Sequence, residues 1–300
     1  MGNFFTNLRQ TYQQGRMPMR FIYMNVGVFI LTFLFQTLLL LFNLNGEEII
    51  RLFELPAWIQ RFLYQPWSLI TYMFMHTEIL HLLFNMLWLY WFGQLFLYFY
   101  SERSFCGLYF LGGLCGGFLY MLFYNIFPYF SLAVYMSYLL GASASVLAIT
   151  VATAVREPDF RVRLLFFGDI RLKYIALAMV GLDLLLMTSG NAGGHIAHLG
   201  GALGGLWFAL GMQKGHDITG WINFIIDKTV DLFSWFSKRP KRKKPKMKVH
   251  YNFREKDYDY NARKKARSEE IDHILDKLKK SGYGSLTTEE KKSLFDASKQ

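Results

Sequence analysis

Residues 104–155 read SFCGLYFLGG LCGGFLYMLF YNIFPYFSLA VYMSYLLGAS ASVLAITVAT AV, and none of these 52 side chains carries a formal charge. A membrane-spanning helix needs about 20 mostly apolar residues. The stretch is therefore long enough for two spans, and the polar interruption near Asn125 and Pro128 divides it between them. This part of the chain is expected to be helical and embedded in a membrane.

The composition of the whole chain supports this expectation. Of its 300 residues, 53% are hydrophobic and 18% charged, against about a quarter charged in a typical soluble domain. This composition excludes a soluble globular protein, a disordered chain, a collagen-like repeat and a disulfide scaffold. The charge is uneven, because residues 214–300 hold 22 of the 33 Lys and Arg residues and 13 of the 22 Asp and Glu residues. A membrane part followed by a basic aqueous tail is predicted.

Three further charge-poor stretches complete the predicted membrane part. They are 21–46, 79–101 and 174–213, the last divided by a glycine-rich break at 188–194. The sequence thus predicts an all-α polytopic membrane fold with six transmembrane helices. Basic residues favour the cytoplasmic side of short loops, and their placement predicts that both termini are cytoplasmic. The expected parts are a cytoplasmic N-terminal segment (1–17), a membrane domain (18–213), an interfacial helix with a polybasic linker (214–250) and a short helical cytoplasmic tail (251–300).

Segments outside the spans have the composition of membrane-surface and tail elements. Residues 45–75 are amphipathic and aromatic and are expected at the outer interface, and residues 221–236 predict a helix on the inner surface. Eight of the eleven residues 238–248 are basic, which favours anionic lipid headgroups over nucleic acid as the partner. In the tail, 268–280 and the stretch from Thr287 predict two helices, the second with a capping box of Thr287 and Glu290.

Six polar side chains within the predicted spans stand out, because hydrogen-bonding groups are costly there and therefore indicate function. They are His81, Asn85, Ser143, Asp183, His195 and His198. Counting about 1.5 Å per residue from the inner ends places Ser143, His198 and Asn85 about 20 to 26 Å above those ends, on three different helices. His81 and Asn85 are four residues apart, so they share one helix face. These side chains are expected to meet near the outer end of the membrane domain.

The spacing of glycines indicates how these helices pack. Gly201 and Gly205 lie on one side of the sixth span, and small residues four apart let two membrane helices approach closely. If the neighbour is the fourth span, His198 comes within reach of Ser143. A helix break at Gly141 would leave about 15 residues for the fourth span, too few to cross alone. Its first turn must then be enclosed by protein, where its free N–H groups suit an oxyanion. The third span repeats the glycine pattern at Gly112, Gly113, Gly116 and Gly117.

These motifs resemble those of a known family. The elements Gly141-Ala142-Ser143, Ala197-His198-x-x-Gly201-x-x-x-Gly205 and His81-x-x-x-Asn85 are similar, in order and placement, to those of the rhomboid intramembrane serine proteases over residues 18–213. The resemblance implies that Ser143 is the nucleophile and His198 its base, and that His81 and Asn85 line the oxyanion hole. It also implies transmembrane protein substrates with small residues at the cut and helix-destabilising residues beyond it. This chain has Ala144 where the family usually has glycine.

The chemistry of these side chains agrees with the resemblance. A serine hydroxyl becomes a good nucleophile when an adjacent histidine takes its proton. The Ser143 N–H, with the His81 and Asn85 side chains, would bind the tetrahedral oxyanion. Asp183 is expected to lie deeper toward the inside, so no carboxylate is expected to orient His198 and a Ser-His dyad is predicted. A structural hydrogen-bonding role for Asp183 and a proton or gating role both stay open.

Other interpretations assign different roles to the polar residues. Ser145 is the competing serine, but two residues along a helix turn it by about 200°. His195 either packs or contributes to the cavity. The histidine spacings lack His-Glu-x-x-His and no cysteine pair has ligand spacing, so no metal or cofactor is expected. The predicted function is hydrolysis of transmembrane proteins near the outer face of a membrane, in the compact form that favours a bacterial inner membrane. The alternative is a noncatalytic rhomboid-like scaffold that binds membrane helices.

Overall fold

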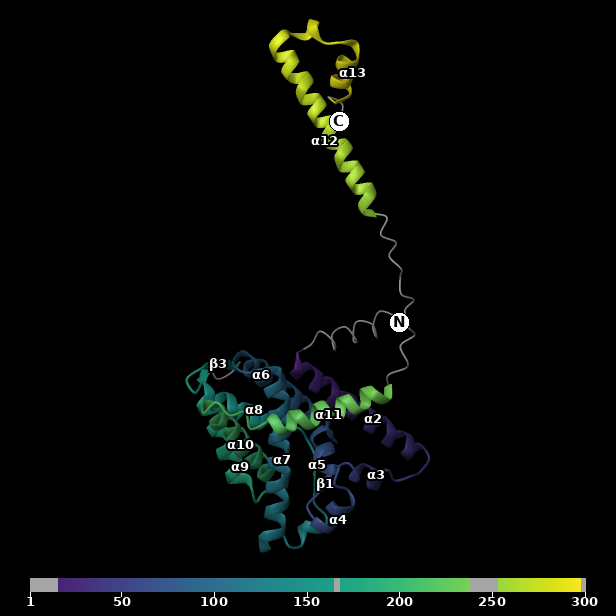
Figure 1. Ribbon diagram of the computed structural model, residues 1–300. Coiled ribbons are helices and arrows are strands. Elements are labelled where there is room, and N and C mark those ends of the chain that lie inside the picture. The colour runs from purple at the N-terminus through teal and green to yellow at the C-terminus, as the bar shows by residue number, and fades with distance from the viewer. Residues whose placement is uncertain (1–15, 165–167, 238–252, 298–300) are drawn as a thin grey trace. The chain divides into compact units, whose positions relative to one another are not determined.

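Six helices of the protein coincide with the six predicted spans. The computed structural model describes residues 16–164, 168–237 and 253–297. Among these residues, three helices are long and apolar enough to cross a membrane. The predicted all-α polytopic membrane fold is confirmed, and the count of six crossings stays a prediction. Figure 1 shows the helices, which are α2 (Met17–Leu41), α6 (Ile79–Phe99), α7 (Glu102–Ile126), α8 (Ser143–Arg156), α9 (Leu172–Leu186) and α10 (Ala192–Gln213), the first three being the long apolar ones.

α8 is the short central helix of this bundle. Its 14 residues span about 21 Å at 1.5 Å per residue, less than the roughly 30 Å of a hydrocarbon core. Residues 144–154 are all buried, because α6, α7, α9 and α10 pack around the helix. The first turn of α8 is thus enclosed by protein, as the break at Gly141 predicted.

Glycines set the separation between α8 and its neighbours. A Cβ atom added at Gly201 would lie 2.7 Å from the carbonyl carbon of Ala144, and one added at Gly205 would lie 2.9 Å from that of Ala148. On the other side of α8, a Cβ atom at Gly116 of α7 would lie 2.6 Å from the Ala144 methyl group. The predicted close approach of the sixth and fourth spans is confirmed, and the glycines of α7 serve the same purpose.

The segment between α2 and α6 folds as a series of short elements. They lie beside the chain that leads into α8, because a two-residue antiparallel pairing joins the two regions, with Leu55 opposite Leu139 and Pro56 opposite Tyr138. This pairing fixes the approach of the chain to Ser143. The elements are α3 (Glu47–Arg51), β1 (Leu55–Pro56), α4 (Ile59–Tyr64), α5 (Ser68–Thr71) and η1 (Tyr72–Phe74), and, before α8, η2 (Pro128–Phe130), η3 (Ala133–Tyr135) and β2 (Tyr138–Leu139).

A β-hairpin between α8 and α9 was not predicted from the sequence. Strands β3 (Arg161–Leu164) and β4 (Gly168–Arg171) pair antiparallel, with Arg161 opposite Arg171. Asp159 accepts hydrogen bonds from Arg171 and Lys173 beside the hairpin. The basic side chains of this stretch indicate only that it is exposed, because charge carries no information on strand pairing.

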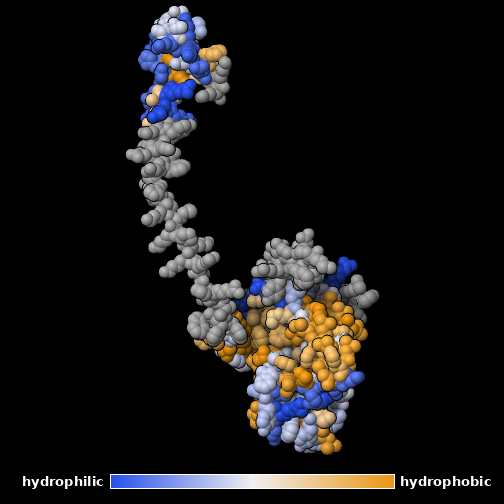
Figure 2. Space-filling view, turned by 90° about the vertical axis from the view of Figure 1, so that its right-hand side faces the viewer, coloured by the Kyte–Doolittle hydropathy of each residue, from blue (hydrophilic) through white to orange (hydrophobic). Residues whose placement is uncertain are grey.

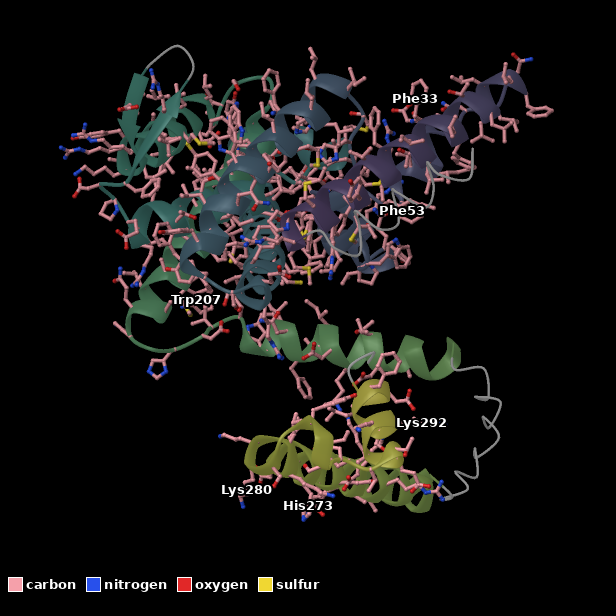
Figure 3. The ribbon with its side chains drawn as sticks, turned by 90° about the horizontal axis from the view of Figure 1, so that it is seen from above. Phe33, Phe53, Trp207, His273, Lys280 and Lys292 are labelled. Atoms are coloured by element: carbon pink, nitrogen blue, oxygen red, sulfur yellow. The ribbon has the colours of Figure 1, made fainter. Side chains whose placement is uncertain are left out.

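The outer surface of the bundle is apolar, as a lipid-facing surface must be. Figure 2 shows hydrophobic side chains gathered over one face of the bundle. α2 buries only Pro18, Phe21 and Asn25 along its length. Phe33 of α2 and Trp207 of α10 lie at the edge of the bundle in Figure 3, and they are 58% and 56% exposed. A helix that is apolar on all sides indicates contact with lipid rather than with water.

The chain divides into two compact units, Met1–Phe236 and Ser237–Gln300. The first ends in α11 (Gly220–Ser237), where the sequence predicted a surface helix. The second contains α12 (Phe253–Ser281), which begins 15 residues before the predicted start at 268, then η4 (Tyr283–Ser285) and α13 (Thr288–Ala297). The predicted capping box is confirmed, because Thr287 and Glu290 exchange side-chain to backbone hydrogen bonds. The basic stretch 238–248 lies outside the described residues.

Candidate active site

Ser143 stands at the start of α8, on a turn that only glycine adopts easily. Gly141 has φ +115°, in the region that L side chains rarely enter. Its N–H donates a 2.9 Å hydrogen bond to the carbonyl of Tyr72, and a Cβ atom there would lie 2.9 Å from the His81 ring. The turn therefore brings the backbone close to His81 and presents the Ser143 hydroxyl to the neighbouring helix.

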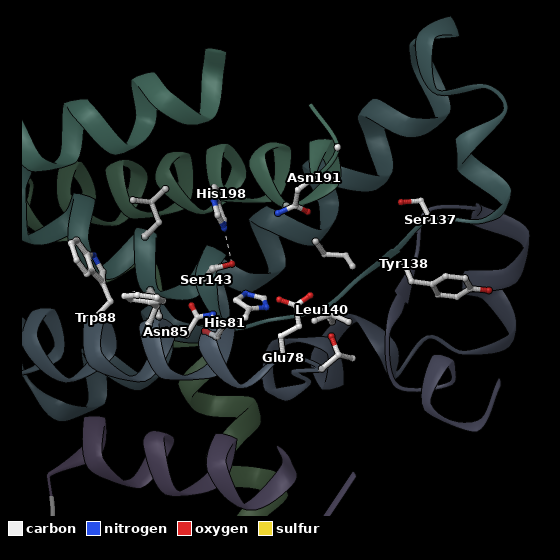
Figure 4. Close-up of a pocket in the computed structure, with 18 of the residues that line it drawn as sticks. Glu78, His81, Asn85, Trp88, Ser137, Tyr138, Leu140, Ser143, Asn191 and His198 are labelled. Atoms are coloured by element: carbon white, nitrogen blue, oxygen red, sulfur yellow. Dashed lines mark hydrogen bonds between the residues drawn. The ribbon is translucent and has the colours of Figure 1, made fainter. Parts of the chain in front are cut away.

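His198 lies directly opposite this hydroxyl. Its Nε2 is 2.7 Å from Ser143 Oγ, and Figure 4 shows the bond running between α8 and α10. His198 is one turn before Gly201, the position at which α10 touches the α8 backbone most closely. The juxtaposition predicted from the glycine pattern is therefore present in the structure.

His81 and Asn85 face the same space from α6, as Figure 4 shows. Asn85 is buried, and its Nδ2 donates a 3.1 Å hydrogen bond to the His81 carbonyl. An amide nitrogen carries two hydrogens, so one remains for a group in the cavity. The first N–H groups of α8 are also without an intrahelical acceptor, as at any helix start. The donors expected for an oxyanion thus surround the Ser143 hydroxyl.

A second histidine, His76, lies behind His81 and was not assigned a role in the site. Their ring centroids are 5.2 Å apart. Burial lowers the pKa of His76 to about 4, and the neighbouring His81 adds to the effect. His76 is therefore neutral at physiological pH and contributes packing rather than charge. Among the described residues, neither of its ring nitrogens has a hydrogen-bond partner.

A cavity of about 1030 Å³ is lined by the side chains of His81, Asn85, Ser143 and His198. A cavity of this size is at the upper end of the range for ligand pockets. It has room for an extended stretch of a peptide and for water. Its remaining walls combine apolar side chains with residues of the chain entering α8 and α10, including Phe84, Trp88, Val146, Leu147, Met179, 136–140, 190, 191, 193 and 194.

Asp183 corrects the prediction of a site without a carboxylate. Its Oδ1 is 2.9 Å from His198 Nδ1 and 2.8 Å from His195 Nδ1. α9 ends at Leu186, so Asp183 lies in the last turn of that helix, beside the first turns of α10. The predicted position of Asp183 was too deep because the sequence does not define where the fifth span ends. The available signal was a carboxylate near the end of one span, followed by a short connection to a span with two histidines near its start.

Ser145 and Ala144 are separated from the cavity. Ser145 is buried, and its hydroxyl has no hydrogen-bond partner among the described residues. Ala144, at the position usually held by glycine in the resembling family, packs against Gly116 and Gly201. Neither of those neighbours has a side chain, so the extra methyl group fits without displacing Ser143.

Three side chains beside the cavity carry donor atoms suitable for a metal ion. The ligand atoms of Asp183, His195 and His198 lie within 4.8 Å of one another. The hydrogen bonds of Asp183 to both histidines already account for this clustering. His76 and His81 form a separate pair, with ring centroids 5.2 Å apart.

Comparison with known proteins agrees with the fold. Residues 64–214 match the family model of the Rhomboid domain, which covers half of the chain. Residues 254–300 match a family of unknown function (DUF6576). The chain is 30% identical over 144 residues to the RHOMBOID-like protein 12, mitochondrial, of Arabidopsis thaliana, a match that covers 45% of this chain and 43% of that relative. The matched region therefore spans less than half of the curated relative. Taken with the helical bundle and its glycine-packed core, the domain match shows that this chain belongs to the rhomboid family.

Proposed function

We propose that the protein is an intramembrane serine endopeptidase that cleaves transmembrane proteins. The observation that carries the proposal is the 2.7 Å separation of His198 Nε2 and Ser143 Oγ at the wall of a large cavity. A serine hydroxyl is a weak nucleophile at neutral pH unless a base within hydrogen-bond reach takes its proton. The arrangement provides that base.

In the first step Ser143 Oγ attacks the carbonyl carbon of the scissile peptide bond, and its proton passes to His198 Nε2. The C–N bond then breaks, and His198 returns the proton to the leaving amine. In the second step water loses a proton to His198 Nε2 and attacks the carbonyl carbon of the acyl ester. The bond between that carbon and Ser143 Oγ then breaks, and His198 returns the proton to Oγ, which frees the new carboxyl end and restores both Ser143 and His198. His198 therefore acts as base and then as acid in both steps.

The tetrahedral intermediate carries a negative charge on the former carbonyl oxygen. The donors assigned to it are the Ser143 N–H at the start of α8 and the side chains of His81 and Asn85. Preorganised donors of this kind stabilise the transition state, and each is worth about 3 to 4 kcal/mol in measured cases. Asn85 is buried, and interactions with charge are stronger among buried groups than in bulk water.

The substrate is a membrane protein that presents its peptide bond near the outer face of the bilayer. Family resemblance supports small residues at the cut and helix-destabilising residues after it, because an extended strand must leave its helix to reach Ser143. The basic stretch 238–248 would bind anionic headgroups on the inner face. The placement of basic loops supports two cytoplasmic termini, and the compact form of the membrane domain supports a bacterial inner membrane.

Labelling with a fluorophosphonate probe tests the proposal. The full-length protein in detergent is compared with Ser143→Ala, His198→Ala and Ser145→Ala, each checked for folding by thermal unfolding. Ser145→Ala is the matched control, because this serine lies two residues from Ser143 and points away from the cavity. We expect the native protein and Ser145→Ala to label and the other two variants to lose labelling.

Two results would contradict this function. Labelling that survives Ser143→Ala would assign the nucleophile to another residue. A folded native protein that neither labels nor cleaves a transmembrane reporter in proteoliposomes would instead be a noncatalytic scaffold that binds membrane helices.

A further inference from the structure

We infer that Asp183 is a positioning residue that fixes the tautomer and orientation of His198, and that His195 holds the Asp183 carboxylate in place for this task. The inference rests on the proposed function, since it concerns the base of the same reaction. It extends the predicted dyad to a hydrogen-bonded chain that runs from α9 through α10 to α8.

The distances identify the partners in this chain, and the acceptor-only chemistry of a carboxylate gives the direction of each hydrogen bond. A single oxygen, Asp183 Oδ1, lies 2.8 Å from His195 Nδ1 and 2.9 Å from His198 Nδ1. An ionised carboxylate only accepts hydrogen bonds, so both Nδ1 atoms must carry a hydrogen. A neutral His198 then has its lone pair on Nε2, 2.7 Å from Ser143 Oγ. That is the tautomer which accepts the serine proton.

The location of Asp183 strengthens its effect. The residue is 6% exposed and lies in the last turn of α9, so the carboxylate is held in a medium where charges interact strongly. When the Ser143 proton reaches Nε2, the His198 ring becomes a cation with both nitrogens protonated. The Nδ1 hydrogen stays between His198 and Oδ1, and Asp183 keeps its negative charge throughout.

His195 supplies the second hydrogen bond to the same oxygen. Its ring is nearly perpendicular to that of His198, at an interplanar angle of 87° with the centroids 6.0 Å apart. A carboxylate with two donors on one oxygen cannot rotate without losing both bonds. His195 therefore restricts Asp183 to the orientation that serves His198, without touching Ser143.

A purely structural role for Asp183 makes a different prediction. A buried carboxylate satisfied by two histidines would hold α9 against α10, and its loss would weaken the fold without a selective effect on chemistry. Asp183→Asn separates the two roles because asparagine has nearly the same shape. Its amide nitrogen can donate to His198 Nδ1, which would move the ring hydrogen to Nε2 and leave no base facing Ser143.

The test measures kcat and KM for a transmembrane reporter in proteoliposomes, with a chelator present so that a metal ion held by the same side chains cannot contribute. The variants are Asp183→Asn, Asp183→Glu and His195→Gln. Asp159→Asn is the matched control, since it makes the same chemical change in an exposed carboxylate outside the site. Thermal unfolding of each variant reports on the fold.

We expect Asp183→Asn to lower kcat by about 10² to 10⁴-fold, with KM changed less than about threefold and the unfolding temperature close to native. Asp183→Glu should recover part of that loss, since it restores an acceptor. His195→Gln should lower kcat by about 3- to 10-fold, the effect of losing one orienting hydrogen bond. Nitrogen-15 NMR of labelled histidines in a Ser143→Ala background should find the His198 hydrogen on Nδ1, and Asp183→Asn should move it to Nε2.

The inference is overturned if Asp183→Asn retains kcat within threefold of native, or if the asparagine and glutamate variants lose activity equally with a matching fall in unfolding temperature. Failure of the proposed function is a separate result. In that case the native protein itself shows no Ser143 labelling, whereas failure of this inference leaves native labelling intact and Asp183→Asn labelled at the native rate.

Discussion

Replacing Gly201 by alanine should disable the site without touching any group that takes part in the chemistry. Gly201 lies on α10 one turn after His198, where the helix meets the backbone of α8. A Cβ atom at this position would lie 2.7 Å from the carbonyl carbon of Ala144 and 2.9 Å from its Cα. These are backbone atoms, so no side chain can rotate to make room. The two helices must separate.

The size of the separation follows from the contact distances. Ordinary contact begins at 3.4 Å, so the Cβ atom needs about 0.7 Å toward that carbon and more toward the adjacent oxygen. A movement of about 1 Å at Gly201 would stretch the 2.7 Å bond between His198 Nε2 and Ser143 Oγ beyond hydrogen-bond length. A misplacement of about 1 Å can cost about 10²-fold in rate. Overpacking also costs roughly 1 to 3 kcal/mol in stability.

The assay compares cleavage of a transmembrane reporter, fluorophosphonate labelling and thermal unfolding in Gly201→Ala and two controls. Gly204→Ala changes the same helix but would contact the side chain of Cys115 at 3.1 Å, which can rotate, so we expect less than tenfold loss. Gly27→Ala adds a methyl group in α2 with no neighbour within 4 Å and should be neutral or stabilise by about 0.5 to 1 kcal/mol. Retention of more than a third of native kcat by Gly201→Ala would refute the reasoning.

Three further predictions concern single side chains. Burial raises the pKa of the Glu54 carboxyl from 4.5 to about 7. The folded protein therefore favours the neutral form of Glu54, and its stability should fall as the pH rises through 7. Glu54→Gln should remove this pH dependence of stability, which is worth up to about 3 kcal/mol. Thermal unfolding of both proteins between pH 5 and 8 measures it. Asn85→Ala should lower kcat by about 10²-fold with little change in KM, and an unchanged rate would remove Asn85 from the oxyanion hole. Tyr72→Phe should lower stability by about 1 to 2 kcal/mol, because the buried Tyr72 hydroxyl donates a 2.6 Å bond to the Gly113 carbonyl; an unchanged unfolding temperature would contradict this.

Helical periodicity explains why much of the site was predictable. His81 and Asn85 share a face because four residues make about one turn, and Gly201 and Gly205 do so for the same reason. Such relations hold within one helix, whatever surrounds it. The approach of α10 to α8 was also predictable, since glycines leave one side of α10 without side chains and a membrane helix uses such a side for close packing.

The hydrogen bonds of Asp183 were not predictable in the same way. They depend on the residue at which α9 ends. A shift of that end by two or three residues changes whether Asp183 lies beside the first turns of α10. Helix ends are the least certain feature of a sequence-based prediction. The pairing of Leu55 with Leu139 is a contact between segments 84 positions apart, and nothing local in either segment specifies it.

α7 shows that the geometry of the site depends on a helix that gives it no chemical group. Gly112 and Gly116 face the side chains of Ala148 and Ala144, so α8 can lie against α7 with its small side chains inserted between the two backbones. α10 then approaches α8 from another side through Gly201. Ser143 is thus held between two glycine-lined surfaces, and its distance to His198 is set by backbone contact rather than by flexible side chains. Bulkier residues on α7 should therefore impair the reaction as an active-site substitution would, while leaving every reacting group in place.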